Sequence, residues 1–246
     1  MPARFLPSGR SILAGLALLV LAGGAYVVAR QTSTFAVAHI EIAGGSPDIR
    51  RQVRRELAPL VGTSLLSLDG SSLERRVDSL PSVVSVAYDR AFPHTLRLTI
   101  VPEKPVAVLH RGTQTWLLSG RGRVVVSVVP GTYPALPRIW VPRVTEVGAG
   151  EFIQPDGAGS AARALAIAAI VHFPARIATA TITHQELVLR LRSGLELRLG
   201  EPTDMRLKLA VARRALRGLP AGTAYLDISV PDRPVAGTNP PVSGRG

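Results

Sequence analysis

The chain has 246 residues, with 29 Lys and Arg against 17 Asp and Glu, and a formal net charge of +12 at pH 7. Because it contains no cysteine, disulfide bonds and thiolate metal sites are excluded. Aromatic residues make up only 4% of the chain, which argues against a single-stranded nucleic-acid binder that stacks bases on aromatic rings. The basic residues alternate with apolar ones or stand beside acids. They therefore indicate an ordinary solvated surface or, as the alternative, one that favours anionic lipid or cell-wall polymers.

An uncharged, strongly apolar segment runs from Ser11 to Ala29. At ~1.5 Å per helical residue, roughly 18 residues of it span about 27 Å, close to the hydrocarbon thickness of a bilayer. We therefore expect a transmembrane helix at residues 12–29. Arg4 and Arg10 precede it, so the positive-inside tendency makes residues 1–11 a cytoplasmic tail. A cleaved signal peptide is the alternative, and in both cases the body that follows is exported.

A first small domain is expected at residues 35–103, after a linker at residues 30–34. Apolar residues predict a strand over 35–42, which two glycines end. Asp48 is a suitable N-cap for the helix that follows. The apolar residues of that helix recur at helical spacing, at Ile49, Val53, Leu57 and Leu60.

Ser71 and Glu74 have the spacing of a capping box, which predicts the start of a second helix that ends before Pro81. Two segments with alternating apolar residues, 84–89 and 95–100, then predict two strands. The order strand, helix, helix, strand, strand predicts an α+β domain in which two helices cover one face of a three-stranded sheet.

A second domain, mostly antiparallel β with one or two helices, is expected at residues 104–230. Gly157 to Val171 is an Ala-rich stretch with the length of a helix. From Glu186 to Gly200, leucines alternate with polar residues on both sides of a Ser-Gly turn, which predicts a hairpin with one buried face. A further helix is expected from Thr203 to Leu219.

The last predicted strand runs from Ala224 to Val230. Its alternation places Leu226, Ile228 and Val230 toward the core and Tyr225, Asp227 and Ser229 toward solvent. The tail at residues 231–246 is rich in Pro and Gly, and we expect it to be disordered.

The residues that end the first domain resemble a known pattern. The segment 80–109 resembles the end of a POTRA domain in the FtsQ/DivIB family of bacterial cell division proteins. Phe92 stands where that family has Trp, and Ser119 stands near the position of a family Asp. The matching positions are Pro81, Val83, Val86, Arg90, Pro93, Thr95, Leu96, Glu103, Pro105, Val106 and Ala107.

The resemblance implies a bitopic membrane scaffold of the divisome, with its C-terminal domain outside the cell membrane at the division septum. Its implied partners are similar to FtsB and FtsL (DivIC), and indirectly the septal peptidoglycan synthase. It implies no enzymatic activity, cofactor, small-molecule substrate or nucleic acid. The family's last strand receives partner proteins, which makes Tyr225, Leu226, Asp227, Ile228, Ser229 and Val230 the expected partner-binding residues. Structural roles are implied for Arg90, Pro93, Leu96, Glu103 and Pro105.

Known catalytic motifs are absent from the sequence. The five histidines lie far apart with no metal-ligand spacing, and there is no nucleophile elbow or phosphate-binding loop. Two alternatives from other classes remain open. One is an exported cell-wall enzyme with a distant carboxylate pair such as Glu103 and Asp156. The other is a POTRA-type chaperone that binds unfolded polypeptides.

Overall fold

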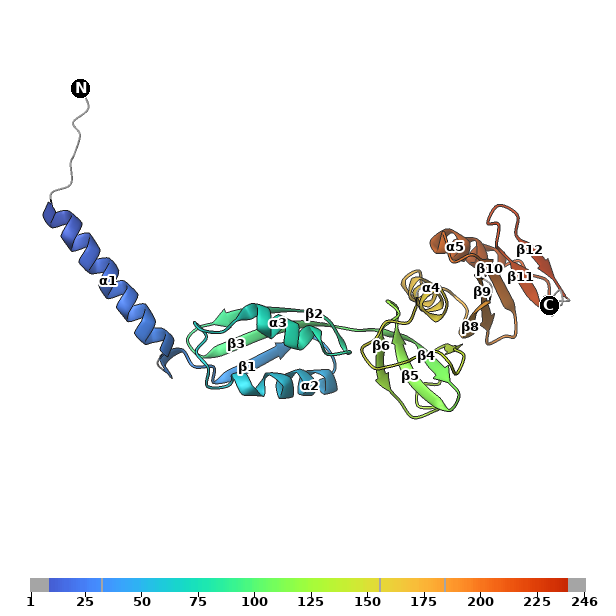
Figure 1. Ribbon diagram of the computed structural model, residues 1–246. Coiled ribbons are helices and arrows are strands. Elements are labelled where there is room, and N and C mark those ends of the chain that lie inside the picture. Colours follow the sequence, from blue (N-terminus) through green and yellow to red (C-terminus); the bar gives the residue numbers. More distant parts are fainter. Residues whose placement is uncertain (1–8, 32, 155, 184, 239–246) are drawn as a thin grey trace, which may run out of the picture. The chain divides into compact units, whose positions relative to one another are not determined.

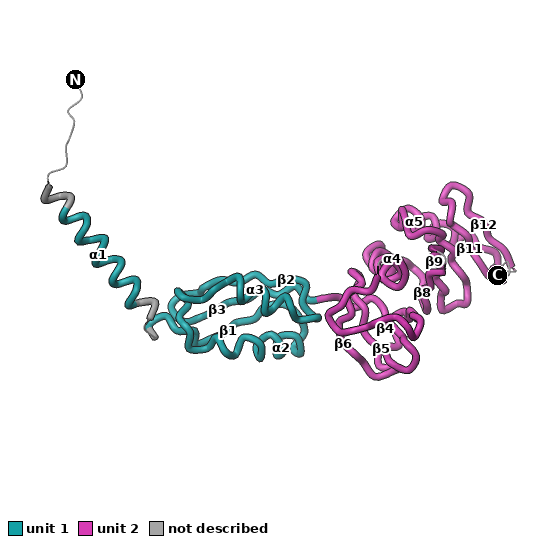
Figure 2. Tube along the Cα trace, in the orientation of Figure 1, with its two compact units in different colours: residues 1–102 teal, residues 103–246 magenta. Residues whose placement is uncertain are grey.

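The structure is a computed structural model that describes residues 9–31, 33–154, 156–183 and 185–238. The chain divides into two compact units, residues 1–102 and residues 103–246, hereafter unit 1 and unit 2 (Figure 2). The predicted cytoplasmic tail lies largely outside the described residues.

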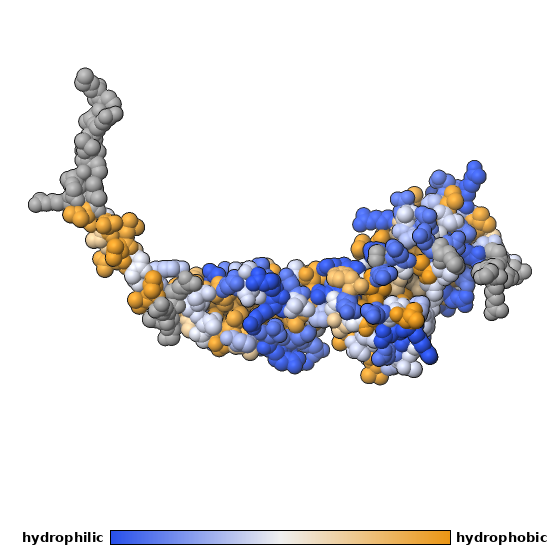
Figure 3. All heavy atoms as spheres, in the orientation of Figure 1, coloured by the Kyte–Doolittle hydropathy of each residue, from blue (hydrophilic) through white to orange (hydrophobic). Residues whose placement is uncertain are grey.

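Helix α1 (Gly9–Gln31) contains the apolar segment found in the sequence (Figure 1). The side chains described within it, at residues 13–28, are all exposed, and most are apolar (Figure 3). None of the helices in the described part of the chain combines the length and the hydropathy that a bilayer span requires.

Unit 1 also contains the predicted α+β domain. Its sheet has the order β1-β3-β2, with β1 parallel to β3 and β2 antiparallel to β3. The elements are a 3₁₀ turn (Ser33–Phe35), β1 (His39–Ala43), α2 (Pro47–Leu57), a second 3₁₀ turn (Ala58–Leu60), α3 (Gly70–Asp78), β2 (Val83–Ala91) and β3 (Thr95–Pro102).

Both helices of this domain bury their apolar residues against one face of the sheet. Val53 and Leu57 of α2 share a core with Leu73 and Val77 of α3 and with alternate residues of β3. The periodicity of the sequence therefore identified the buried face correctly.

The starts of these elements differ from the predicted ones. The first strand begins at His39, because Phe35 belongs to a 3₁₀ turn. Ser46, and not Asp48, caps α2, because Pro47 at the first helical position already has the φ angle that a helix needs. At α3 the cap is Asp69, whose carboxylate accepts the backbone N–H of the predicted cap Ser71 at 3.1 Å.

Unit 2 is built on one nine-stranded sheet of the order β12-β11-β10-β9-β8-β7-β4-β5-β6, in which antiparallel ladders outnumber parallel ones. The strands are β4 (Pro105–Arg111), β5 (Gln114–Ser119), β6 (Val124–Ser127), β7 (Arg138–Trp140), β8 (Ile177–Thr183), β9 (Glu186–Leu191), β10 (Glu196–Gly200), β11 (Tyr225–Asp227) and β12 (Val235–Gly237).

Two helices, α4 (Ala158–Ile170) and α5 (Met205–Ala215), share one large core with this sheet. Alanines of α4 pack closely, and the alternating leucines of the β9–β10 hairpin lie beneath the helices. A buried lysine fixes α5 to the end of β10: Lys208 Nζ donates to the carbonyl oxygens of Leu199 and Glu201, each at 2.7 Å. The predicted hairpin is present, and α5 is shorter at both ends than expected.

The C-terminal strand differs most from its prediction. Strand β11 covers only Tyr225–Asp227, and the segment that was expected to be a disordered tail returns to form β12. Tyr225 lies opposite Gly237 in this antiparallel pair. The expectation of disorder is therefore wrong for Val235–Gly237, because the unpaired backbone groups of β11 provide partners that composition does not reveal. Residues 239–246 lie outside the described part.

Candidate functional site

Strand β12 ends the sheet of unit 2 at its C-terminal border. Strand β11 lies between β10, which is parallel to it, and β12, which is antiparallel to it. Both sides of β11 are thus paired. Among the described strands the outermost position at this border belongs to β12, and a three-residue Val-Ala-Gly segment gave no periodic signal by which the sequence could reveal it.

Two of the residues expected to bind partners are core residues. Leu226 and Ile228 are 1% and 0% exposed. The N–H of Ile228 donates to the Arg198 carbonyl oxygen at 2.7 Å, so this backbone group is used inside the sheet. These two residues hold β11 in the core, and the prediction that they present an open strand edge is wrong.

The other four lie nearer the surface. Asp227 Oδ1 accepts hydrogen bonds from the Ser229 N–H at 2.9 Å and the Ser229 hydroxyl at 2.7 Å, which ends the strand in a turn. Val230 is 55% exposed beyond this turn. Tyr225 is partly buried in the sheet.

Four neighbouring side chains form a row across the sheet: Arg190, Glu196, Arg198 and Tyr225. Arg190 pairs with Glu196 on the adjacent strand, and Arg198 lies 3.7 Å from the same carboxylate. The Arg198 guanidinium lies 5.2 Å from the centroid of the Tyr225 ring. Gly237 faces that ring so closely that a Cβ there would lie 2.6 Å from it. The row therefore links β9, β10 and β11, and β12 packs against the Tyr225 ring through Gly237.

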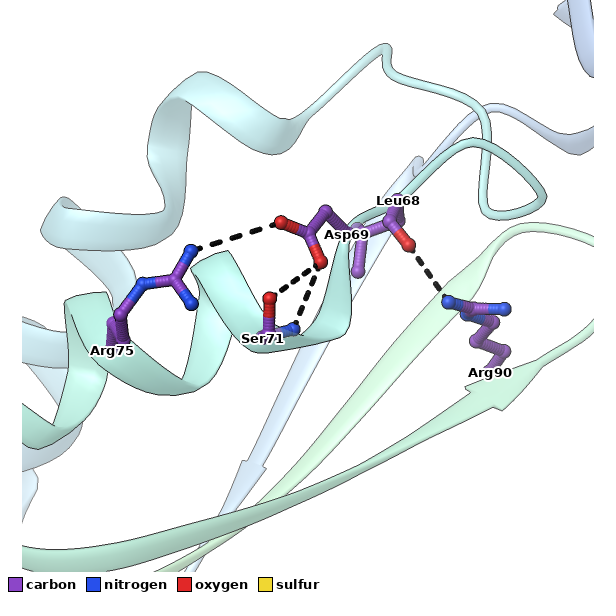
Figure 4. A network of polar contacts seen from close by, with 5 residues as sticks. All are labelled: Leu68, Asp69, Ser71, Arg75 and Arg90. Carbon is purple, nitrogen blue, oxygen red and sulfur yellow. Dashed lines mark hydrogen bonds and ion pairs between the residues drawn. The ribbon is translucent and has the colours of Figure 1, made fainter.

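Arg90 of unit 1 connects β2 with the loop before α3 (Figure 4). Its Nη2 donates to the Leu68 carbonyl oxygen at 2.7 Å, and its guanidinium lies 6.0 Å from the Tyr88 ring centroid. The next residue, Asp69, caps α3. The hydrogen bond from the Ser71 hydroxyl, with further bonds from backbone N–H groups, holds the pKa of Asp69 below its ordinary value.

The other motif residues take structural positions. Leu96 is fully buried in the core of unit 1, and Pro93 lies in the turn between β2 and β3. Pro105 begins β4 opposite Ser119. Glu103 is buried, and its Oε1 lies 3.8 Å from Arg121 Nη1.

A groove of about 860 Å³ in unit 2 is lined by Asp156 but not by Glu103. The two carboxylates that were considered as a glycosidase pair therefore do not share this groove. Among the described residues, no group of three histidine or carboxylate side chains is placed to hold a metal ion.

Comparisons with known proteins agree with these features. The family model for the POTRA domain of the FtsQ type matches residues 35–101, which is the α+β domain of unit 1. The chain is similar to the cell division protein FtsQ of Streptomyces venezuelae, with 24% identity over 94% of this chain and 85% of the relative. It is 29% identical to FtsQ of Myxococcus fulvus over 87% of this chain and 77% of that relative.

A third relative, FtsQ of Agrobacterium fabrum, is 27% identical over 56% of this chain and 44% of its own length. Two of the three alignments thus extend through unit 2, well beyond the POTRA domain. Unit 1 therefore contains a POTRA domain of the FtsQ type, and most of the chain is similar to cell division proteins named FtsQ.

Proposed function

We propose that the protein is a membrane-anchored scaffold of the bacterial divisome that binds other division proteins outside the membrane and links them to septal peptidoglycan synthesis. The single observation that carries the partner site is the pairing of β12 with β11, which makes a short strand the last described member of a large sheet. The relatives are named cell division proteins, which supports a role in cell division. The scaffold acts by binding and not by catalysis.

Helix α1 is the proposed anchor. Ser11 to Ala29 carries no charged residue, and the described apolar side chains of α1 are exposed. Exposed leucine and valine side chains along a helix favour hydrocarbon over water by about 25 cal/mol per Å² of apolar surface. Arginines at positions 4 and 10 support a cytoplasmic N-terminus. We therefore propose that both folded units lie on the other side of the cell membrane, at the septum.

The proposed partner site is the border of β12 that faces away from β11, with which no other described strand pairs. An edge strand offers backbone N–H and C=O groups, and each hydrogen bond made to them contributes about 0.5–1.5 kcal/mol net. Several such bonds, together with contacts to Val230 and to the row at Tyr225, support strand addition by a partner protein. Anchoring both proteins in one membrane raises their effective concentration. The proposed partners are proteins similar to FtsB and FtsL (DivIC).

Site-specific cross-linking in cells tests this proposal, because the natural chain contains no cysteine. Val235 is 55% exposed in β12, so Val235→Cys labelled with a photo-cross-linker is expected to capture the FtsB-like and FtsL-like proteins. The matched control is Val129→Cys, which is 74% exposed on unit 2 outside β12. Equal capture of these partners at both positions, or capture at neither, would contradict strand addition at β12.

The two competing functions predict different outcomes in the same preparation. A POTRA-type chaperone would be cross-linked through unit 1 to many unrelated polypeptides. An exported cell-wall enzyme would release fragments from purified peptidoglycan. We expect neither result.

A further inference from the structure

The groove of unit 2 lies apart from the β12 border and has no role in the function proposed above. The end of β7 and the loop that follows it supply one wall, including Trp140 and Glu146. The loop that precedes α4 supplies the other, including Glu151, Phe152 and Asp156. Its volume of about 860 Å³ is within the range of sites that bind a ligand or a short chain segment.

Hydrogen bonds hold both walls in place. Arg111 Nη1 donates to the Thr145 carbonyl oxygen at 2.9 Å, which ties the first loop to β4. The Glu151 carbonyl oxygen accepts the Val124 N–H at 2.8 Å, which ties the second loop to β6. The Ile153 N–H donates to the carbonyl oxygen of Gly122 at 2.9 Å. The groove is thus preformed, so a ligand would not have to order it.

Two exposed aromatic rings line the groove, and neighbouring side chains orient both. Trp140 is 50% exposed and stacks on His110 with 5.1 Å between ring centroids. Phe152 is 55% exposed, and the guanidinium groups of Arg121 and Arg123 lie 5.7 and 5.8 Å from its centroid. Exposed aromatic side chains that other residues hold in position are typical anchors for a partner.

The charge of the lining is opposite to that of the protein. Its ionisable residues are Glu146, Glu151 and Asp156, and no Lys or Arg is among them. In the described part of the chain, none of these three carboxylates forms an ion pair. A chain of net charge +12 therefore has an acidic groove with apolar and aromatic walls.

We propose that this groove binds a segment of a partner protein in which Arg or Lys side chains stand next to apolar ones. The carboxylates accept hydrogen bonds from guanidinium or ammonium groups. The face of Trp140 takes either an apolar side chain or a cation. An anionic segment is disfavoured, because it would bring its charges close to the three carboxylates of the lining.

Fluorescence anisotropy with the full-length protein in detergent micelles tests the proposal. The probe is a labelled seven-residue peptide of alternating Leu and Arg, blocked at both ends, and its counterpart has Glu in place of Arg. The Arg peptide is expected to bind and the Glu peptide is not. Because the protein is strongly basic, nonspecific attraction would favour the Glu peptide instead.

Two triple variants with equal charge change identify the site. Glu146→Gln, Glu151→Gln and Asp156→Asn together are expected to weaken binding of the Arg peptide at least tenfold, and Trp140→Ala alone several-fold. The matched triple variant, Glu56→Gln, Glu74→Gln and Glu186→Gln, changes carboxylates outside the groove and is expected to leave binding within threefold.

Several results would overturn the proposal. These are equal losses in both triple variants, equal binding of the two peptides, or no binding of the Arg peptide to the natural protein. A further variant, Ala236→Pro in β12, separates this site from the proposed scaffold function. It is expected to retain the Arg peptide while losing the FtsB-like partner, and loss of the peptide would show that the probe had added to the sheet border instead.

Discussion

Arg90 joins two segments of the POTRA domain that lie 22 residues apart in the chain. Its bond to the Leu68 carbonyl oxygen holds the loop from which Asp69 caps α3. The resemblance alone implied a structural role for Arg90, and we propose that this hydrogen bond is that role. The Nε of Arg90 is buried without a hydrogen-bond partner among the described residues.

Replacing Arg90 by Met is expected to lower the free energy of unfolding by about 1–3 kcal/mol, because the Leu68 carbonyl loses a charge-assisted hydrogen bond. Urea unfolding measures this change. The control is Arg75→Met, which removes an exposed 3.9 Å ion pair to Asp69 and is expected to change stability much less, because solvent screens the pair (Figure 4). Equal losses in the two variants would contradict the role given to Arg90.

His110 makes the stability of unit 2 depend on pH. Burial, and next the nearby positive charge of Arg138, lower the pKa of His110 below its ordinary value of 6.5. The unfolded chain therefore binds the proton more readily than the folded chain does. Stability due to this group is fully present above pH 6.5 and falls as the pH drops below that value.

Replacing His110 by Phe is expected to reduce this dependence, because Phe keeps the stacking on Trp140 but does not titrate. The measurement is the free energy of unfolding between pH 7.5 and pH 5 for both proteins. An identical slope in the variant would show that other groups cause the dependence.

At the scale of elements, the position of β12 depends on the close contact between Gly237 and the Tyr225 ring. Gly237 lies against the Tyr225 ring, where any Cβ would come within 2.6–2.8 Å of ring atoms. The next contact along the pair is a hydrogen bond from the Ala224 N–H to the Gly237 carbonyl oxygen at 2.8 Å. Glycine is required here by space and not by backbone conformation.

Replacing Gly237 by Val is therefore expected to displace β12 and to weaken capture of the FtsB-like partner at least tenfold. Hydrogen exchange at the Ala224 amide measures the displacement, because its acceptor would be lost. The control, Val235→Ala, removes an exposed side chain of the same strand without a clash. If the Ala224 amide stays protected in Gly237→Val, the proposed packing of β12 against Tyr225 is wrong.

At the scale of the whole molecule, the proposed function depends on holding two folded units on an anchor. The apolar surface of α1 is the largest exposed apolar stretch of the described chain, and each folded unit has its own core. Residues of α1, the proposed anchor, belong to neither core.

Replacing Leu18 and Leu21 together by Arg is expected to release the protein from the membrane fraction while both units stay folded. Each Arg at the centre of a spanning helix costs about 2.5–3.5 kcal/mol of insertion free energy. Cell fractionation measures the release, and Leu18→Val with Leu21→Val is the apolar control. A charged variant that stays in the membrane fraction would show that α1 is not the anchor.

The sequence by itself determined most core-facing residues, although Val230, which alternation placed toward the core, is 55% exposed. The alternating leucines of the β9–β10 hairpin and the helical spacing in α2 lie where their periods predict, because burial of one face imposes a period on the chain. The family resemblance likewise depended on local motifs, chiefly the segment 80–109.

The tertiary structure alone decided which strands are neighbours. Alternation shows which face of a strand is buried but not which strand pairs with it, so the contact of β12 with β11 had no local signal. The groove also joins loops that are distant along the chain, and its charge emerges only when they meet. Strand pairing and grooves depend on contacts between residues that are distant along the chain, whereas hydrophobic periodicity depends only on residues that are close together in the sequence.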